Sequence, residues 1–300
     1  MIERMVAFWS EEDGCGITSG MAAVASVCAD VWQRKIILLQ SRNQEGDLCQ
    51  KLGNGARTQI FVQEEDRSER RDGWDQQPAP DRNQQPTRER LFACLIPVVR
   101  GRMYYLPQGD YKKREKYPGY MKEEMRQTID LAEQMSDLTF VDCGSGRDDL
   151  SEFLLSMADV AVIGISQERQ NLDAYFQNRH VYRGNVVYLV NQYQQESIYN
   201  KKNLNRLFRL GEEELTVIPG NPVFRHVSDR GKTERFIRRH MQCRFYDHQY
   251  DFMKELMQTT RIILKAAGYE KTIRSPPLKM QPALPYTKLT GQRDCRKLQI

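Results

Sequence analysis

The stretch SEEDGCGITSG, residues 10–20, decides the fold, because its glycines and hydroxyl residues join a short apolar strand to a long apolar helix. We expect the strand at 6–9, and apolar residues recur at helical spacing from Ile17 to Val31. A second apolar stretch, KIILLQ at 35–40, follows at once. This order of strand, glycine turn, helix and strand predicts a β-α-β unit of a parallel sheet covered on both faces.

The same alternation continues through the rest of the chain. We expect helices at 120–135, 150–157, 171–178, 201–210 and 246–267, and strands at 138–142, 160–166, 185–191 and 215–220. LFACLIPVV, residues 91–99, fits either a helix or a strand, and MYYLPQGD, residues 103–110, indicates a strand that enters a turn. The sequence therefore predicts the α/β class, with a mostly parallel, twisted sheet between two layers of helices.

Composition predicts one domain, an insertion and a tail. The chain has 300 residues, of which 40% are hydrophobic, and this supplies a core for a single domain at 1–268. Residues 64–90 are charged and Gln-rich, so we expect a mobile surface insertion there. From Lys265 onward, eight Lys or Arg residues stand against two acidic ones, and this net charge of +6 exceeds the +5 of the whole chain. With its prolines, this composition predicts a basic, disordered tail at 269–300.

Cysteine use and hydropathy favour a cytoplasmic protein. The seven cysteines are scattered and form no CxxC, so we expect reduced thiols rather than disulfides or a zinc site. No apolar run reaches the roughly 18 residues of a membrane span, and the N-terminus does not resemble a signal peptide. The apolar stripe of the last helix is explained by core packing more simply than by a membrane anchor.

The loop at 10–20 has most of the parts of a phosphate-binding loop. In such a loop, glycines let backbone N–H groups face the phosphates, a hydroxyl holds Mg²⁺ and a lysine neutralises charge. The candidate phosphate-binding residues are consecutive: Gly14, Cys15, Gly16, Ile17, Thr18 and Ser19. Ile17 stands where the lysine is expected. Taken alone, this pattern is equally typical of a tight turn before a helix.

A second candidate segment is FVDCGSG, residues 140–146, at the end of an expected strand. Ligands of open parallel sheets bind at the carboxyl ends of the strands. Asp142 is therefore placed to hold Mg²⁺ through water, and Gly144 or Gly146 to present an N–H to a phosphate. Cys143 is interpreted as a structural cysteine rather than a nucleophile, because no histidine is expected beside it.

Taken together, these segments resemble the MinD and ParA group of deviant-Walker P-loop ATPases, over most of 1–268 apart from the insertion. EDGCGITS, residues 12–19, matches the length of the family's loop KGGxGK[ST]. The resemblance places Glu12 on the signature lysine, Ile17 on the ordinary lysine and Thr18 on the hydroxyl that holds Mg²⁺.

Later segments carry the resemblance in the same order. QSRNQEGDL aligns with the family's DxDxxxxNL and puts Gln40 and Arg42 on its two aspartates. DCGSG takes the place of DxPxG, and ADVAVIGISQERQNLDAY resembles the family's next strand and helix. VVYLVNQ ends at the adenine-contacting asparagine, here Asn191, and VIPGNPVFRHVSDRGK resembles the segment that begins I-P-x-D, with Pro219 as its proline.

The resemblance implies a three-layer P-loop NTPase-like fold, a homodimer and a site for ATP and Mg²⁺. It assigns the Mg²⁺ to Thr18 and Asp142 and the adenine pocket to Asn191 and Pro219. Because both lysines and the water-positioning aspartate are replaced, we expect weak or absent ATP binding, no catalytic residue and a pseudo-ATPase. Arg42 is either a substitute cation or a solvated loop arginine, and the second interpretation is favoured.

The leading functional hypothesis is a positioning or scaffold protein with a degenerate nucleotide site. The TadZ/CpaE branch, which places Tad-type pilus or secretion machinery, is the part of the family that this pattern resembles most. Such a protein would be cytoplasmic, with a peripheral place at the inner membrane face. The alternative is an active ParA/MinD-type ATPase in DNA partitioning or cell-division placement. A third class, nucleic-acid binding by the basic tail, is disfavoured by the tail's prolines and scarcity of aromatics.

Overall fold

A computed structural model describes residues 5–41, 48–53, 87–107, 118–177, 182 and 184–269. Arg42 therefore lies outside the described residues. So do most of the expected insertion, since only 87–90 of it are described, and the expected tail beyond Tyr269. Thr87 caps a helix that begins at Arg88, so the last residues of the segment assigned to the insertion belong to regular structure.

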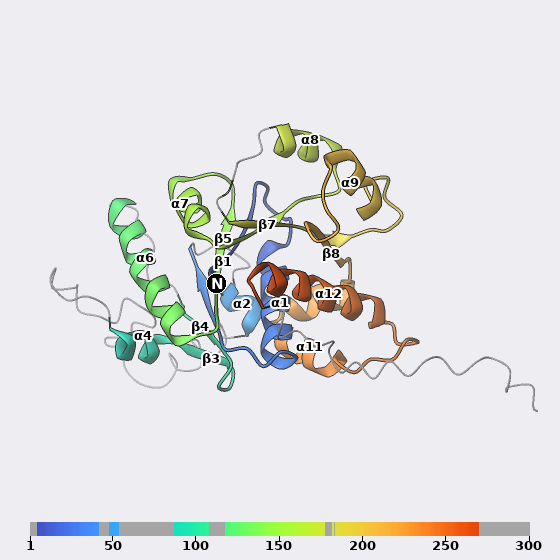
Figure 1. Cartoon of the computed structure of the whole chain (residues 1–300). Helices are drawn as coiled ribbons and strands as arrows, with labels where there is room; N and C mark the ends of the chain where they lie inside the picture. Colours follow the sequence, from blue (N-terminus) through green and yellow to red (C-terminus); the bar gives the residue numbers. More distant parts are fainter. Residues whose placement is uncertain are drawn as a thin grey trace, which may run out of the picture.

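The described residues form one sheet of eight strands in the order β3-β4-β2-β5-β1-β6-β7-β8 (Figure 1). Every neighbouring pair is parallel except β3 and β4, which are antiparallel. The strands are β1 (Met5–Ser10), β2 (Ile36–Gln40), β3 (Ile96–Val99), β4 (Met103–Tyr105), β5 (Leu138–Ser145), β6 (Val160–Gly164), β7 (Asn185–Tyr193) and β8 (Leu215–Pro219). The mostly parallel α/β sheet predicted from the sequence is confirmed.

Helices cover both faces of this sheet, which gives the three layers expected (Figure 1). The first face carries α1 (Ile17–Asp30), α2 (Leu48–Leu52), α10 (Pro222–Ser228), α11 (Thr233–His240) and α12 (Tyr250–Ala266). The opposite face carries α4 (Arg88–Cys94), α6 (Pro118–Met135), α7 (Asp149–Met157), α8 (Arg169–Gln177) and α9 (Lys201–Phe208).

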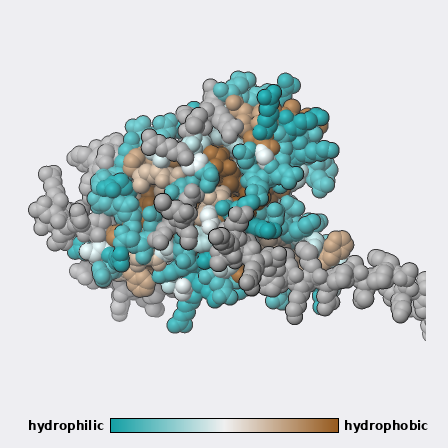
Figure 2. Space-filling view, viewed as in Figure 1, coloured by the Kyte–Doolittle hydropathy of each residue, from teal (hydrophilic) through white to brown (hydrophobic). Residues whose placement is uncertain are grey.

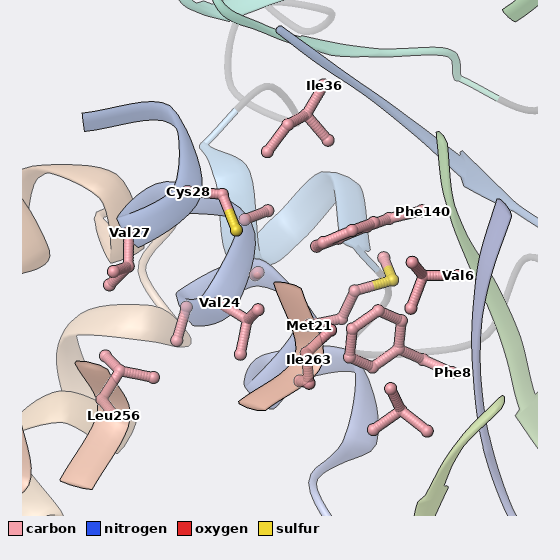
Figure 3. Close-up of a cluster of buried hydrophobic side chains, with 14 of the residues drawn as sticks. Val6, Phe8, Met21, Val24, Val27, Cys28, Ile36, Phe140, Leu256 and Ile263 are labelled. Atoms are coloured by element: carbon pink, nitrogen blue, oxygen red, sulfur yellow. The ribbon is translucent and has the colours of Figure 1, made fainter. Parts of the chain in front are cut away.

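Two hydrophobic cores follow from the alternation of side chains along the strands. Along β1, Val6 and Phe8 face the first core, and Ala7 and Trp9 face the second. Figure 3 shows the first core, where α1 packs against the sheet and against α12, which lies on the same face. The rings of Phe8 and Phe140 from neighbouring strands lie 5.1 Å apart there. This packing buries nearly all of α1 and fixes the helix whose N-terminal end adjoins the glycine loop.

The structure adds elements that the sequence pattern did not resolve. The stretch at 91–99, which fitted either a helix or a strand, contains both the end of α4 and all of β3. Three short helices, α2, α10 and α11, were not predicted. All three lie on the first face: α2 and α11 pack against α1, and α10 packs against α2 and α11.

On the face seen in Figure 2, the described surface is mostly hydrophilic, with hydrophobic residues in small areas. The large hydrophobic side chains that are exposed are scattered through the described chain: Phe92, Ile198, Leu207, Val223, Phe245 and Tyr246. None of the helices that the structure describes is long and apolar enough to cross a membrane.

Candidate nucleotide site

The loop between β1 and α1 keeps a backbone that only glycine adopts readily. Gly14 has φ of 80° and Gly16 has φ of 70°, both in the left-handed region. Gly16 is the N-cap of α1, and no side chain caps this end of the helix. The N–H groups of the first helical turn, which have no partner within a helix, therefore remain directed at the loop. This end of α1 is suited to an anion.

A cavity of about 1270 Å³, here called the loop cavity, opens at this end of α1. All six residues predicted for the phosphate loop line it, from Gly14 to Ser19. Gly144, Asn191 and Pro219, which come from the ends of three other strands, also line it. The structure thus brings together residues from four segments that the sequence pattern had singled out separately, at the edge of the sheet where α/β proteins bind ligands.

The three carboxylates before the loop all contact neighbouring loops and helices. Glu11 forms an ion pair with Arg147 at 3.0 Å, and Asp13 accepts a hydrogen bond from the Ser145 hydroxyl. The Glu12 carboxylate accepts one from the Asn171 amide of α8 and lies in a small side pocket rather than in the lining of the loop cavity. Burial, and then the nearby Glu168 carboxylate, raise the pKa of Glu12. Glu12 is therefore turned away from the place where a phosphate would bind.

Ile17, at the position that the resemblance gives to the ordinary lysine, belongs to the first core and is only 5% exposed. A Cβ atom added to Gly164 would lie 3.3 Å from Cδ1 of Ile17, so strand β6 packs directly against this side chain. Ile17 is thus held by apolar contacts, and it brings no charge to the loop cavity.

Gln40, at the position that the resemblance gives to an aspartate, is 5% exposed at the end of β2. Its Oε1 accepts hydrogen bonds from the backbone N–H of Leu48, at 3.3 Å, and from the hydroxyl of Tyr105, at 3.4 Å. The side chain therefore ties α2 and β4 to the end of β2. A neutral amide that already accepts these two hydrogen bonds does not act as a general base.

Asp142 lies near the end of β5, is 2% exposed, and pairs in register with Gln40 of β2 and Phe8 of β1. Its Oδ1 accepts a hydrogen bond from the N–H of Gly144 at 3.0 Å. Asp142 does not reach the lining of the loop cavity, whereas Gly144 does. Gly146 also stays outside the lining, and its carbonyl accepts a hydrogen bond from Nε1 of Trp9 at 2.8 Å.

Asn191, at the predicted adenine position, has a feature that fits a ligand. Its Nδ2 is buried and has no hydrogen-bond partner among the described residues. A Cβ atom added to Gly20 would lie 2.6 Å from Asn191 Oδ1, so the glycine leaves room for this amide. An unpartnered buried N–H₂ is costly unless something accepts its hydrogen bond. A nucleotide base offers such acceptors, so these residues fit the predicted nucleotide.

Several cavity-lining residues were not predicted from the sequence. Lys51 of α2 and Asp229 at the end of α10 form an ion pair in the cavity wall. Gln192 donates a hydrogen bond from Nε2 to the carbonyl of Gly14 at 3.5 Å. The one signal in the sequence that could have identified Gln192 is that it directly follows Asn191. No pattern in the sequence indicates that Lys51 and Asp229 form an ion pair.

The described residues do not support a cysteine nucleophile or a metal site built from protein side chains alone. Cys143 is fully buried in the second core, in agreement with a structural role. Among the described residues, no group of three or more His, Cys, Asp or Glu side chains is arranged to hold a metal, and the six described cysteines are free. A Mg²⁺ site would therefore depend on the phosphates of a nucleotide for most of its ligands.

Comparison with known proteins places the fold. No protein-family model matches the chain, and no curated protein sequence matches it. Solved structures do match, over most of this chain and most of their own chains. They include ParA and MinD ATPases. The chain therefore has the fold of these P-loop ATPases, and the predicted resemblance is confirmed as a likeness of fold.

Three of these structures illustrate the match. A ParA family ATPase from Chlorobium tepidum gives a TM-score of 0.63 at 13% identity and covers 86% of this chain and 98% of its own. MinD from Pyrococcus horikoshii, complexed with Mg-ADP, gives 0.61 at 14% identity and covers 89% and 98%. A chain of the MinC–MinD cell division complex from Aquifex aeolicus gives 0.57 at 15% identity and covers 87% and 96%.

Proposed function

We propose that this chain is a MinD/ParA-like positioning or scaffold factor that binds ATP and Mg²⁺ weakly or not at all and hydrolyses ATP slowly or not at all. The observation that carries the proposal is Ile17. At the position of the phosphate-loop lysine, its side chain is buried in the core against β6 instead of supplying a charge.

The other replacements act in the same direction. Phosphoryl transfer depends on positioning and on stabilisation of developing negative charge, so the loss of a charge contact costs orders of magnitude in rate. Glu12, held by Asn171, cannot reach a partner subunit's phosphates as the signature lysine is expected to do. Gln40 serves to anchor α2. Neither Glu12 nor Gln40 is therefore placed to activate water in the proposed site.

The retained parts favour binding over chemistry. Thr18 would hold Mg²⁺ directly and Asp142 would hold it through water, while Asn191 and Pro219 would flank adenine. When bound, the ion would neutralise phosphate charge. The glycine loop and the unpartnered Asn191 amide support this assignment.

The cellular role is proposed from the resemblance. In this proposal the chain is a homodimer in the cytoplasm, placed at the inner membrane face by protein partners of a positioning system, such as Tad-type pilus or secretion machinery. The solved complex of MinC with MinD supports the idea that a protein of this fold acts through a protein partner.

Calorimetric titration with Mg-ATP and a phosphate-release assay test this function. We expect measurable but weak binding that Thr18→Ala weakens further, and phosphate release at about a hundredth or less of the rate of a ParA ATPase assayed alongside. Ile17→Lys should raise binding or turnover, because it restores a cation. Turnover equal to that of the ParA ATPase, with no gain from Ile17→Lys, would show that the site is not degenerate.

The second candidate is an active ATPase in DNA partitioning or cell-division placement. The observation that favours it is the loop cavity, which is lined by Thr18 and Ser19, the hydroxyl residues of the predicted phosphate loop. The same phosphate-release assay separates it from the scaffold proposal.

A further inference from the structure

Lys51 is a largely covered cation in the wall of the loop cavity. Only 12% of its side chain is exposed, compared with 49% for its partner Asp229. Its ammonium forms an ion pair with the Asp229 carboxylate, and both residues line the cavity that Thr18 lines. A lysine that is largely withdrawn from water interacts more strongly with a second charge than a solvated lysine does.

The position of Lys51 is fixed by the packing of α2. Leu48 and Leu52 are buried in the first core, and the N–H of Leu48 donates to Gln40 at the end of β2. Gly53, just after the helix, touches the backbone of Gly231, since a Cβ atom added to Gly53 would lie 2.2 Å from the Gly231 oxygen. Helix α2, which carries Lys51 in its last turn, therefore begins beside the strand end where Gln40 is in register with Asp142.

The other cations that line the cavity are less suited to face a phosphate. Among the described lining residues, these are Lys201, Arg225 and Lys254. Arg225 and Lys254 are exposed, so solvent and salt screen their charges. Lys201 begins α9, which packs on the face of the sheet opposite α1.

We propose that Lys51 provides the positive charge for the phosphates of a bound nucleotide that Ile17 no longer provides, and that Asp229 competes with the phosphates for it. This inference rests on the proposed nucleotide binding and adds a residue that the resemblance does not assign. It also assigns Asp229 a definite effect, because a carboxylate that holds the ammonium opposes the binding of another anion to it.

Titration of the full chain with Mg-ATP, Mg-ADP and adenosine tests the inference. Lys51→Met keeps the length of the side chain and removes its charge, and we expect it to weaken Mg-ATP binding about ten- to a hundred-fold. Adenosine binding should change little, because adenosine carries no phosphate. Asp229→Asn should strengthen Mg-ATP binding, since it frees the ammonium.

The matched control is the pair Lys265 and Glu213, 2.7 Å apart on the surface and absent from the cavity lining. Lys265→Met and Glu213→Gln should leave nucleotide binding unchanged. If Lys51→Met binds Mg-ATP as Lys265→Met does, the inference is wrong while the proposed function stands. If neither the native chain nor Asp229→Asn binds any of the three probes, the inference is wrong, while a scaffold function without bound nucleotide still stands. Equal losses for ATP and adenosine would also overturn the inference, because they indicate a structural effect.

Discussion

Cys15 sits inside the glycine loop, and its surroundings make it an unreactive thiol. Burial, and then the carboxylates of Glu12, Glu168 and Asp13, raise the pKa of Cys15 to about 11. A raised pKa keeps the thiol protonated, and the protonated form is a poor nucleophile. The rate at which the Cys15 thiol reacts should therefore depend on its burial and on the negative charge of the nearby carboxylates.

This charge leads to a test by alkylation. At pH 8 only about a thousandth of Cys15 should be thiolate, so iodoacetamide should modify it slowly, and the rate should rise about tenfold for each pH unit. The rise should continue to the pKa of about 11. Glu12→Gln removes a nearby negative charge and should lower that pKa and speed alkylation at pH 8. Peptide mapping by mass spectrometry gives the rates; a rate already constant above pH 9 would contradict the assignment.

At the predicted site positions, the sequence identified which residues differ from the family pattern but not what holds them. The replacement of a lysine by Ile17 could be seen in the sequence. The burial of Ile17 against Gly164 could not be seen in the sequence, because Ile17 lies in α1 and Gly164 lies in β6, far apart in the chain. Likewise the contacts of Glu12 with Asn171 and of Gln40 with Leu48 depend on how segments pack.

Helix α2 is held on the turn between α10 and α11 by two facing glycines. Gly53 has φ of 78° and Gly231 has φ of 69°, and a Cβ atom on Gly231 would lie 2.3 Å from Cα of Gly53. Both the backbone conformation and the close approach require glycine. The ion pair of Lys51 and Asp229 therefore depends on a contact made only by backbone atoms.

We expect Gly53→Ala to destabilise the chain more than its backbone conformation alone explains. Gly101 is the matched control, because it has φ of 78° as well and nothing within 4 Å of an added Cβ atom. Gly101→Ala should cost about 1 kcal/mol of the free energy of unfolding, and Gly53→Ala about 2–4 kcal/mol. Urea unfolding measures both. Equal losses would show that α2 moves aside at no cost.

Short helices explain most of what the sequence pattern missed. Five residues in α2 and seven in α10 are too few for a helical repeat of apolar residues to appear. The long, buried strands and α1 were predicted because their apolar patterns extend over enough residues. The antiparallel strand β3 was hidden in an apolar run whose first half forms α4.

Tyr269 links the end of the last helix to the first half of the chain. Its hydroxyl donates to the carbonyl of Asp137 at 2.7 Å, and the Arg34 guanidinium lies 4.6 Å from the centre of its ring. The side chain is 6% exposed, so it belongs to the folded part although the predicted domain ends at 268. Tyr269 is therefore part of the folded domain and packs in the first core.

Substitution of Tyr269 tests that packing. Tyr269→Ala should lower the free energy of unfolding by about 3 kcal/mol, because it removes a buried ring and a hydrogen bond. Tyr246, which is 72% exposed, is the control, and Tyr246→Ala should change Tm little. Thermal unfolding of the full chain compares the two. A Tm equal for both variants would place Tyr269 outside the cooperative fold.

The order of the strands across the sheet was beyond the sequence pattern. Alternating strands and helices predict a parallel sheet with a binding site at the carboxyl ends of its strands; the mostly parallel sheet is present, and the loop cavity opens at that edge. Which strand lies beside which depends on contacts between distant residues. The pairing of β1 with β5 and β6, which brings Gly144 to the loop, is such a case.

Pro97 lies exposed in β3, the strand at one margin of the sheet. A proline has no backbone N–H, so this margin lacks a hydrogen-bond donor that an incoming strand would need. Margins of this kind resist edge-to-edge aggregation between molecules. Extension of the sheet from one molecule to the next is therefore disfavoured at Pro97 of β3.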